Sequence, residues 1–282
     1  MKKTIFLQIT VLVVLTMTGC TGSSSANKSG AKSGAGKWKL VWSDEFNYKG
    51  LPDSTKWNYE VGDNGWGNNE KEYYMEKSLE NSYADGNVLH IVALHKKMGN
   101  AGYTSAKLTT YQKFSLQYGK VEVMAKLPSG KGTWPAIWML PESLLKGEED
   151  WPLCGEIDIM EHVGKNPGFI HVSLHSKLYN HIISTQVTHF EKLPDVFNTF
   201  HKYAIEWTKE SIIFYIDDKL FYATTRGEDG RVSTNEGWPF DKPYYLILNL
   251  AIGGNWGGEI DNSIFPAEMQ VDYVRFYKKA EN

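Results

Sequence analysis

Apolar and polar positions alternate with a period of two from Trp38 to the end of the chain. The clearest case is GKVEVMAKL (119–127), in which Val121, Val123 and Ala125 occupy every second position. Successive side chains of a strand point to opposite faces, so this alternation indicates strands with one buried face. Four further segments have the same Val, Ile, Tyr and Phe-rich composition: NVLHIVAL, HKYAIEW, SIIFYIDDKLFYATT and YLILNLAI.

Turn residues separate these segments. Asp217, Asp218 and Lys219 lie between two strand segments and predict a hairpin turn. The only stretch compatible with a helix is a turn or two between Glu142 and Glu148, and no internal repeat is visible. Many short strands without helices predict one all-β domain. We expect an antiparallel two-sheet β-sandwich of the jelly-roll type.

The first 37 residues have a different composition. Lys2 and Lys3 precede an apolar run over residues 5–17, which is too short for a membrane span and ends in MTGC (17–20). The run predicts an export signal over residues 1–19. It resembles a bacterial lipoprotein signal, in which Cys20 would carry the lipid, although Met17 replaces the usual Leu. An ordinary secretory signal with an incidental cysteine is the alternative.

Residues 20–37 are rich in Ser, Gly and Ala and predict a flexible tether, so the folded domain is expected over residues 38–282. We expect a monomer exported to the bacterial cell envelope and held at a membrane only by its lipid. Without residues 1–19 the formal charge is 28 − 33 = −5, and no basic patch favours nucleic acid. Cys154 is then the only cysteine besides Cys20, so no disulfide is expected within the domain.

Three acids interrupt an apolar run in GEIDIMEHVG (155–164). Glu156 and Asp158 are two residues apart and share one face of a strand, whereas Glu161 comes one residue too late for that face. The flanking isoleucines should face the core. A β-bulge near Met160 would absorb the extra residue and return Glu161 to the face of the other two acids.

Two glutamates on one face suit glycoside hydrolysis, because close carboxylates repel and one of them stays protonated. If the Glu156 and Glu161 side chains lean together, their carboxyl groups approach the ~5–5.5 Å of a retaining enzyme. A wider pair would leave room for water and would invert the anomeric configuration. The alternatives are a calcium or magnesium site built from the three acids, or a merely solvated strand face.

The acid segment resembles the signature of family 16 glycoside hydrolases, in the form that has the extra residue. Four further segments match that family in the same order: GWGNNE (65–70), YGKVEVMAKLPSGKGTWPAIWMLP (118–141), LNLAIGGNWGG (248–258) and FPAEMQVDYVRFY (265–277). The resemblance spans nearly all of residues 38–278 in the laminarinase-like order. It implies a jelly roll with a cleft across its concave sheet, and retaining cleavage within β-glycan chains.

The resemblance also implies a role for each matching residue. Glu156 would be the nucleophile, Asp158 its partner and Glu161 the general acid/base, with no cofactor for catalysis. Other residues would contact the substrate, the first two tryptophans on the donor side: Trp134, Trp138, Asn68, His175 and Trp256. Exposed aromatic rings suit the apolar faces of sugars. Three further tryptophans are expected to fill the core: Trp42, Trp57 and Trp207.

A structural calcium ion on the convex side is also implied, held by Glu45, Gly86 and Asp272; a solvated or N–H-satisfied carboxylate is the alternative for the two acids. Lys107 departs from the family pattern because it stands where Arg is common, which keeps the charge and loses the bidentate fork.

The segment 173–193 also departs from the usual laminarinase loop and offers His175, His181 and His189. We expect hydrogen bonding at the cleft edge or surface placement for these histidines. Metal binding is the alternative, because three histidines lie close together in the sequence.

The expected partner is a β-glycan polysaccharide. The laminarinase-like order implies β-1,3-glucan or mixed-linkage β-1,3/1,4-glucan. One alternative is an endo-β-galactosidase type of activity on β-galactan or poly-N-acetyllactosamine. A remoter one is a non-catalytic carbohydrate-binding sandwich, since fold alone does not give function. Such a binding module would have no need of both Glu156 and Glu161.

Overall fold

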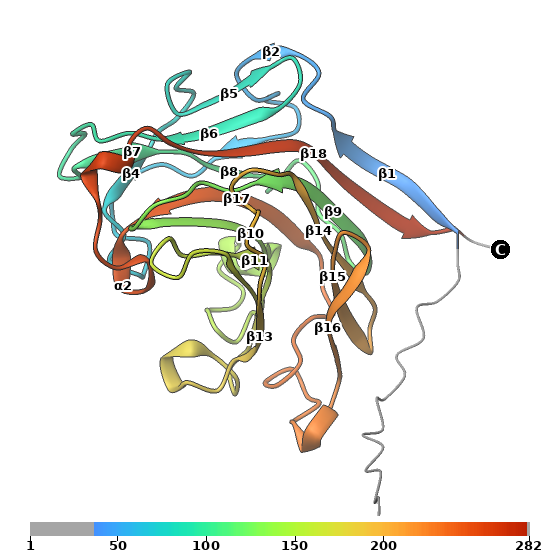
Figure 1. Cartoon of the computed structure of the whole chain (residues 1–282). Coiled ribbons are helices and arrows are strands. Elements are labelled where there is room, and N and C mark those ends of the chain that lie inside the picture. Colours follow the sequence, from blue (N-terminus) through green and yellow to red (C-terminus); the bar gives the residue numbers. More distant parts are fainter. Residues whose placement is uncertain (1–36, 281–282) are drawn as a thin grey trace, which may run out of the picture. The chain divides into compact units, whose positions relative to one another are not determined.

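Two antiparallel β-sheets pack face to face in the computed structural model, which describes residues 37–280 (Figure 1). This arrangement confirms the expected all-β sandwich. The expected signal, Cys20 and all of the expected tether except Lys37 lie outside the described residues. Within residues 37–280 no helix is long and apolar enough to cross a membrane.

The larger sheet has nine strands. In spatial order they are β16 (Lys219–Thr225), β15 (Ser211–Ile216), β14 (His201–Trp207), β9 (Gly119–Lys126), β18 (Ala267–Lys279), β6 (Leu89–Ala93), β5 (Ser82–Asp85) and β2 (Lys49–Gly50), with β1 (Trp38–Asp44) also paired to β18.

The second sheet has seven strands and carries the acids. Its order is β13 (Val187–Lys192), β12 (Phe169–His175), β11 (Glu156–Glu161), β10 (Thr133–Pro141), β17 (Tyr244–Ile252), β8 (Lys107–Thr109) and β3 (Asn58–Tyr59). The only parallel pair among the described residues is β4 (Glu72–Tyr74) with β7 (Tyr103–Ser105).

Helices are few and short. They are α1 (Glu142–Leu145), α2 (Gly254–Gly257) and the 3-10 turns η1 (His181–Ile183), η2 (Glu228–Gly230) and η3 (Asn262–Ile264). The position of α1 agrees with the single helical turn expected from the sequence. The hairpin between β15 and β16 is also confirmed, since Asp217 and Asp218 have φ of 51° and 63°. Both angles are those of a type I′ turn.

The core lies between the sheets and follows the period-two pattern. In β9, Val121, Val123 and Ala125 are fully buried, as the alternation predicts. The tryptophans assigned to the core also lie there. Trp57 and Trp207 are each 1% exposed, and Trp42 packs against the same cluster.

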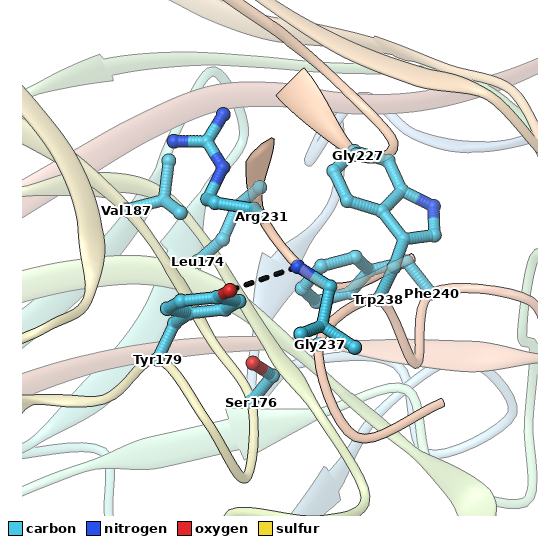
Figure 2. A pocket seen from close by; sticks show the side chains of 10 residues that line it. Leu174, Ser176, Tyr179, Val187, Gly227, Arg231, Gly237, Trp238 and Phe240 are labelled. Carbon is cyan, nitrogen blue, oxygen red and sulfur yellow. Dashed lines mark hydrogen bonds between the residues drawn. The ribbon is translucent and has the colours of Figure 1, made fainter. Parts of the chain in front are cut away.

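Loops after β12 and β16 close one end of the sandwich. The Tyr179 hydroxyl accepts a hydrogen bond from the Val232 backbone N–H at 2.8 Å (Figure 2). Leu174, Trp238 and Phe240 line a hollow of about 10 Å³ beside this bond (Figure 2). A space of that size has room for no more than one water, so this end of the molecule is packed.

Cys154 lies in the turn before β11. Its thiol is free and buried, and burial raises its pKa to about 12. The described residues therefore contain no disulfide, as expected from the cysteine count.

Candidate active site

One extra residue in β11 changes the register of the acid strand. On the β10 side, Ile137 pairs with Met160 and Trp138 pairs with Asp158, so Ile159 has no partner. A bulge of this kind leaves one residue unpaired and bends its strand. The structure therefore confirms the bulge, with Ile159 as its extra residue.

The same shift is visible on the β12 side. Asp158 pairs with Ser173 and Glu161 pairs with His171, so three steps along β11 match two steps along β12. The apolar side chains between the acids are buried in the core. All three acids therefore lie on the opposite face of the seven-stranded sheet, which we call the acid face.

The pairing extends across the sheet as two rows on the acid face. The row through Glu161 is Phe190 on β13, His171 on β12, Glu161 on β11, Ala136 on β10, Asn249 on β17 and Lys107 on β8. The row through Asp158 is Thr188, Ser173, Asp158, Trp138, Ile247 and Thr109. Directly paired residues share a face, so each row runs perpendicular to the strands.

An indole N–H holds each glutamate. Trp151 Nε1 donates to Glu156 Oε2 at 2.9 Å, and Trp134 Nε1 donates to Glu161 Oε1 at 3.0 Å. These two bonds fix the acids at opposite ends of β11. Trp134 was expected at the site from the sequence. Trp151 was not, although its position five residues before Glu156 was a signal that could have suggested it.

His175 lies between Glu156 and Asp158. Its Nε2 lies 3.2 Å from Asp158 Oδ2 and 3.7 Å from Glu156 Oε1. Asp158 is almost completely buried beneath this contact. The His175 imidazole thus lies close to both Glu156 and Asp158, and Glu161 follows them on the same strand, beyond the bulge. Such a group can attack a carbon centre, donate a proton and take one back.

The chain is similar to known proteins in sequence and in fold. Residues 64–275 match the family model described as glycosyl hydrolases family 16. Over its full length the chain is 47% identical to a beta-glucanase of Rhodothermus marinus and covers 96% of that protein. The chain belongs to glycosyl hydrolase family 16. It is therefore a glycoside hydrolase, and it belongs to a family that needs no catalytic cofactor.

Two other relatives bear on the fold and the substrate. The crystal structure of the laminarinase from Rhodothermus marinus has a TM-score of 0.84 and 48% identity, over 88% of this chain and all of the other. A keratan-sulfate endo-1,4-beta-galactosidase of Sphingobacterium multivorum is 39% identical over 86% of this chain and 55% of its own length. The family and the jelly-roll fold expected from the sequence are confirmed.

Burial gives the acids of this hydrolase unusual proton affinities. It raises the pKa of Glu156 to about 8 and that of Asp158 to about 8, and the Asp158 charge adds to the effect on Glu156. The pKa of Glu161 lies well above its usual range for the same two reasons. Glu156 accepts a hydrogen bond from Trp151 and lies 3.7 Å from His175 Nε2, and both neighbours lower its pKa, whereas Glu161 accepts one indole bond and lies farther from His175. Glu161 is therefore the acid that holds a proton most firmly.

Lys107 lies on the acid face and is buried. Its Nζ is 2.6 Å from Glu60 Oε2, and it sits 4.4 Å from the ring centre of Trp66 and 5.0 Å from that of Trp138. The lysine charge is therefore balanced by Glu60 and by two aromatic faces. A single ammonium group suffices for this cage, although it lacks the fork of an arginine.

A chain of hydrogen bonds holds Trp138. Its Nε1 donates to Asn249 Oδ1 at 2.7 Å, and Asn249 Nδ2 donates to the Tyr74 hydroxyl at 3.0 Å. Tyr74 donates to Glu70 Oε2 at 3.1 Å, and Asn68 Nδ2 donates to Glu70 Oε1 at 3.3 Å. An indole N–H can only donate, so every donor in the chain has a fixed direction. Two expected substrate contacts, Trp138 and Asn68, are thus joined through one carboxylate.

Glu72 lies beside that carboxylate and is fully buried. Burial and the neighbouring Glu70 raise the pKa of Glu72 well above its usual range. Its Oε2 accepts a hydrogen bond from the Ile252 backbone N–H at 2.7 Å. Burial therefore favours the neutral form of Glu72. Burial also raises the pKa of Glu70, but Lys107 and the donors Asn68 and Tyr74 act against that rise, so Glu70 is the better acceptor of the two.

The remaining expected contact, Trp256, packs edge-on against Trp134 with ring centres 5.4 Å apart. The three histidines expected as a possible metal set do not come together. His181 lies beside His175, with ring centres 5.2 Å apart, whereas His189 stacks on Tyr222 of the other sheet. Within residues 37–280, the only three ligating groups close enough for a metal are Glu156, Asp158 and His175.

The residues expected to hold calcium lie on or next to three strands of the nine-stranded sheet. Gly86 follows β5, Asp272 is on β18, and Glu45 follows β1. Both Glu45 carboxylate oxygens accept hydrogen bonds from Arg275, at 2.9 and 2.7 Å. Arg275 thus engages both oxygens of the Glu45 carboxylate. The calcium therefore stays a prediction.

Proposed function

We propose that this family 16 enzyme is a retaining endo-β-glucanase that hydrolyses β-1,3-glucan or mixed-linkage β-1,3/1,4-glucan. The relationship to the Rhodothermus beta-glucanase carries this proposal, because it extends over the whole chain and nearly the whole relative. The acid-face rows support action within chains, since they cross the sheet on both sides of β11.

The reaction follows from the positions of the acids. Glu156, as the carboxylate, attacks the anomeric carbon while Glu161 gives its proton to the leaving oxygen, so that one C–O bond forms as another breaks. Glu161, now ionised, takes a proton from water, and the water oxygen displaces Glu156. Asp158 and His175 hold Glu156 in place. Trp134 and Trp138 flank the donor side of the substrate path, where Lys107 and Asn68 lie beyond Trp138.

The second candidate is an endo-β-galactosidase type of activity, favoured by the relationship to the keratan-sulfate enzyme. The two candidates are separated by products on a panel of laminarin, lichenan, agarose and keratan sulfate. We expect oligosaccharides by mass spectrometry from laminarin or lichenan, and proton NMR should show the β anomer first. Initial α anomer would refute retention, and products from the galactans alone would refute the glucanase.

We also propose that Cys20 carries a lipid that anchors the enzyme in the bacterial cell envelope. The sequence MTGC supports this proposal, together with the apolar run before it and the tether after it. The wild type should fractionate with membranes, and a Cys20→Ala variant should not. Equal distribution of both forms would refute the anchor.

For calcium, we propose a structural ion held by Glu45, Gly86 and Asp272. A ligand that binds only the folded state raises the melting temperature with its concentration. Melting curves with EGTA and with millimolar calcium should therefore differ, and identical curves would refute the ion. The monomer is also a proposal, and light scattering tests it.

A further inference from the structure

A series of aromatic rings leads from Glu161 to the edge of the sheet. Trp134 bonds Glu161, and Trp256 packs on Trp134 with ring centres 5.4 Å apart. His171 packs on Trp256 at 5.0 Å, and Phe190 stacks on His171 at 5.1 Å with an angle of 29°. The series therefore connects the proposed acid/base to a ring on β13.

Phe190 is the exposed end of this series. It is 54% exposed, on an edge strand where an apolar ring gains little from burial. It is the direct cross-strand partner of His171, which is in turn the partner of Glu161, so all three lie on the acid face. Its neighbour His189 lies on the other face and stacks on Tyr222. Phe190 is therefore not part of the packing between the sheets.

His171 gives the exposed ring a firm backing. Burial lowers the pKa of His171 to about 4, so the imidazole is neutral at physiological pH and stacks as an uncharged ring. Phe169 supports Phe190 from a second side, with ring centres 6.2 Å apart. The Phe190 ring is thus held in one orientation with much of its surface open.

The number of strands between Glu161 and Phe190 indicates which sugar unit would lie over the Phe190 ring. Neighbouring strands lie about 4.8 Å apart, which is comparable to the length of one sugar unit in an extended β-glycan. Phe190 is two strands from Glu161 in the row. A glycan that follows the row would place about its second sugar beyond the cleaved bond over the Phe190 ring.

We propose that Phe190, backed by His171 and Phe169, is a sugar-binding platform on the acceptor side of the cleaved bond. This proposal rests on the proposed function, which puts Trp138, Lys107 and Asn68 on the donor side. Phe190 lies on the other side of β11. Its ligand is the apolar face of a pyranose unit in the leaving part of the polysaccharide.

The test compares substrates that reach the platform with one that does not. Laminarihexaose reaches it, whereas in an aryl laminaribioside only the aryl group lies on the acceptor side. We expect Phe190→Ala to lower kcat/KM for laminarihexaose about tenfold and to leave the aryl substrate within twofold of the wild type. The ratio of transglycosylation to hydrolysis should also fall, because acceptor sugars bind less well.

Three variants serve as controls. Phe190→Tyr should retain wild-type values, and Phe190→Leu should behave like Phe190→Ala because it keeps apolar volume without a flat face. Leu220→Ala removes a side chain that is 65% exposed on the other sheet, and it should change nothing.

The contrary outcomes are distinct. Equal losses on both substrates would show a structural role for Phe190, and no loss on laminarihexaose would show that no sugar binds there. An unchanged transglycosylation ratio would overturn the acceptor-side placement. If the wild type cleaves neither substrate, the proposed glucanase fails instead, and the variants are compared on oligosaccharides of the glycan that it does cleave.

Discussion

A Glu156→Gln variant should release reducing sugar from its polysaccharide at least about 10⁴ times more slowly than the wild type. The amide cannot bond the anomeric carbon, so the covalent intermediate does not form. The fold should survive, because Glu156 lies on the acid face and the buried side chains of β11 are unchanged. Glu210→Gln, at an exposed turn before β15, is the matched control and should keep full activity.

The same variant should gain stability relative to the wild type as the pH rises. Burial raises the pKa of Glu156 to about 8 in the folded wild type, so the attacking carboxylate forms as the pH approaches 8, whereas the unfolded chain ionises near 4.5. The folded state therefore binds more protons in this window, and wild-type stability falls as the pH increases through it. Glutamine has no such proton. The melting temperature of Glu156→Gln minus that of the wild type should grow from pH 5 to pH 9, by several degrees.

Two results would contradict this picture. Substantial turnover by a folded Glu156→Gln, with no nucleophile added, would remove Glu156 from its role. A melting difference that is the same at pH 5 and pH 9 would show that Glu156 titrates normally in the folded enzyme.

The second large effect is expected for Glu161→Ala, and it depends on the leaving group. Polysaccharide cleavage should fall by about 10²–10⁴-fold, because the leaving sugar oxygen needs a proton. An aryl oligosaccharide with an acidic phenol needs little protonation, so its first step should survive much better. The glycosyl-enzyme should then accumulate on Glu156, where mass spectrometry of the intact protein detects it.

Azide completes the test of Glu161. It attacks the glycosyl-enzyme without a general base, so it should restore turnover of the aryl substrate by Glu161→Ala and yield the β-glycosyl azide. Equal losses on polysaccharide and aryl substrate, with no response to azide, would place the acid/base elsewhere. Trp134→Phe is a useful companion, since it removes only the bond from Trp134 Nε1 to Glu161.

The sequence was sufficient to predict features that depend on a single strand. The period of two identified the strands, and the spacing of Glu156, Asp158 and Glu161 was enough to predict the bulge, because face alternation is a local property. Contacts between distant segments could not be predicted from the sequence. The bond that joins Asn249 to Tyr74 brings together residues 175 positions apart, and no local pattern marks it.

The positions of His175 and His189 could not be predicted from the sequence either. His175 and His189 were grouped by their nearness in sequence, but they lie on different strands and on opposite faces of the sheet. The face of an edge-strand residue depends on the register with its neighbour, which the loop between β12 and β13 sets. Composition and spacing cannot give that register.

The buried thiol of Cys154 has a practical consequence for handling the enzyme. Only thiolates react readily with oxidants and alkylating agents, and a pKa of about 12 leaves roughly one thiolate in 10⁴ at pH 8. Iodoacetamide, glutathione disulfide and air should therefore leave Cys154 of the folded enzyme unmodified. The domain should purify and store without a reducing agent, and any covalent dimer in an ageing preparation would be a sign that the sandwich had opened.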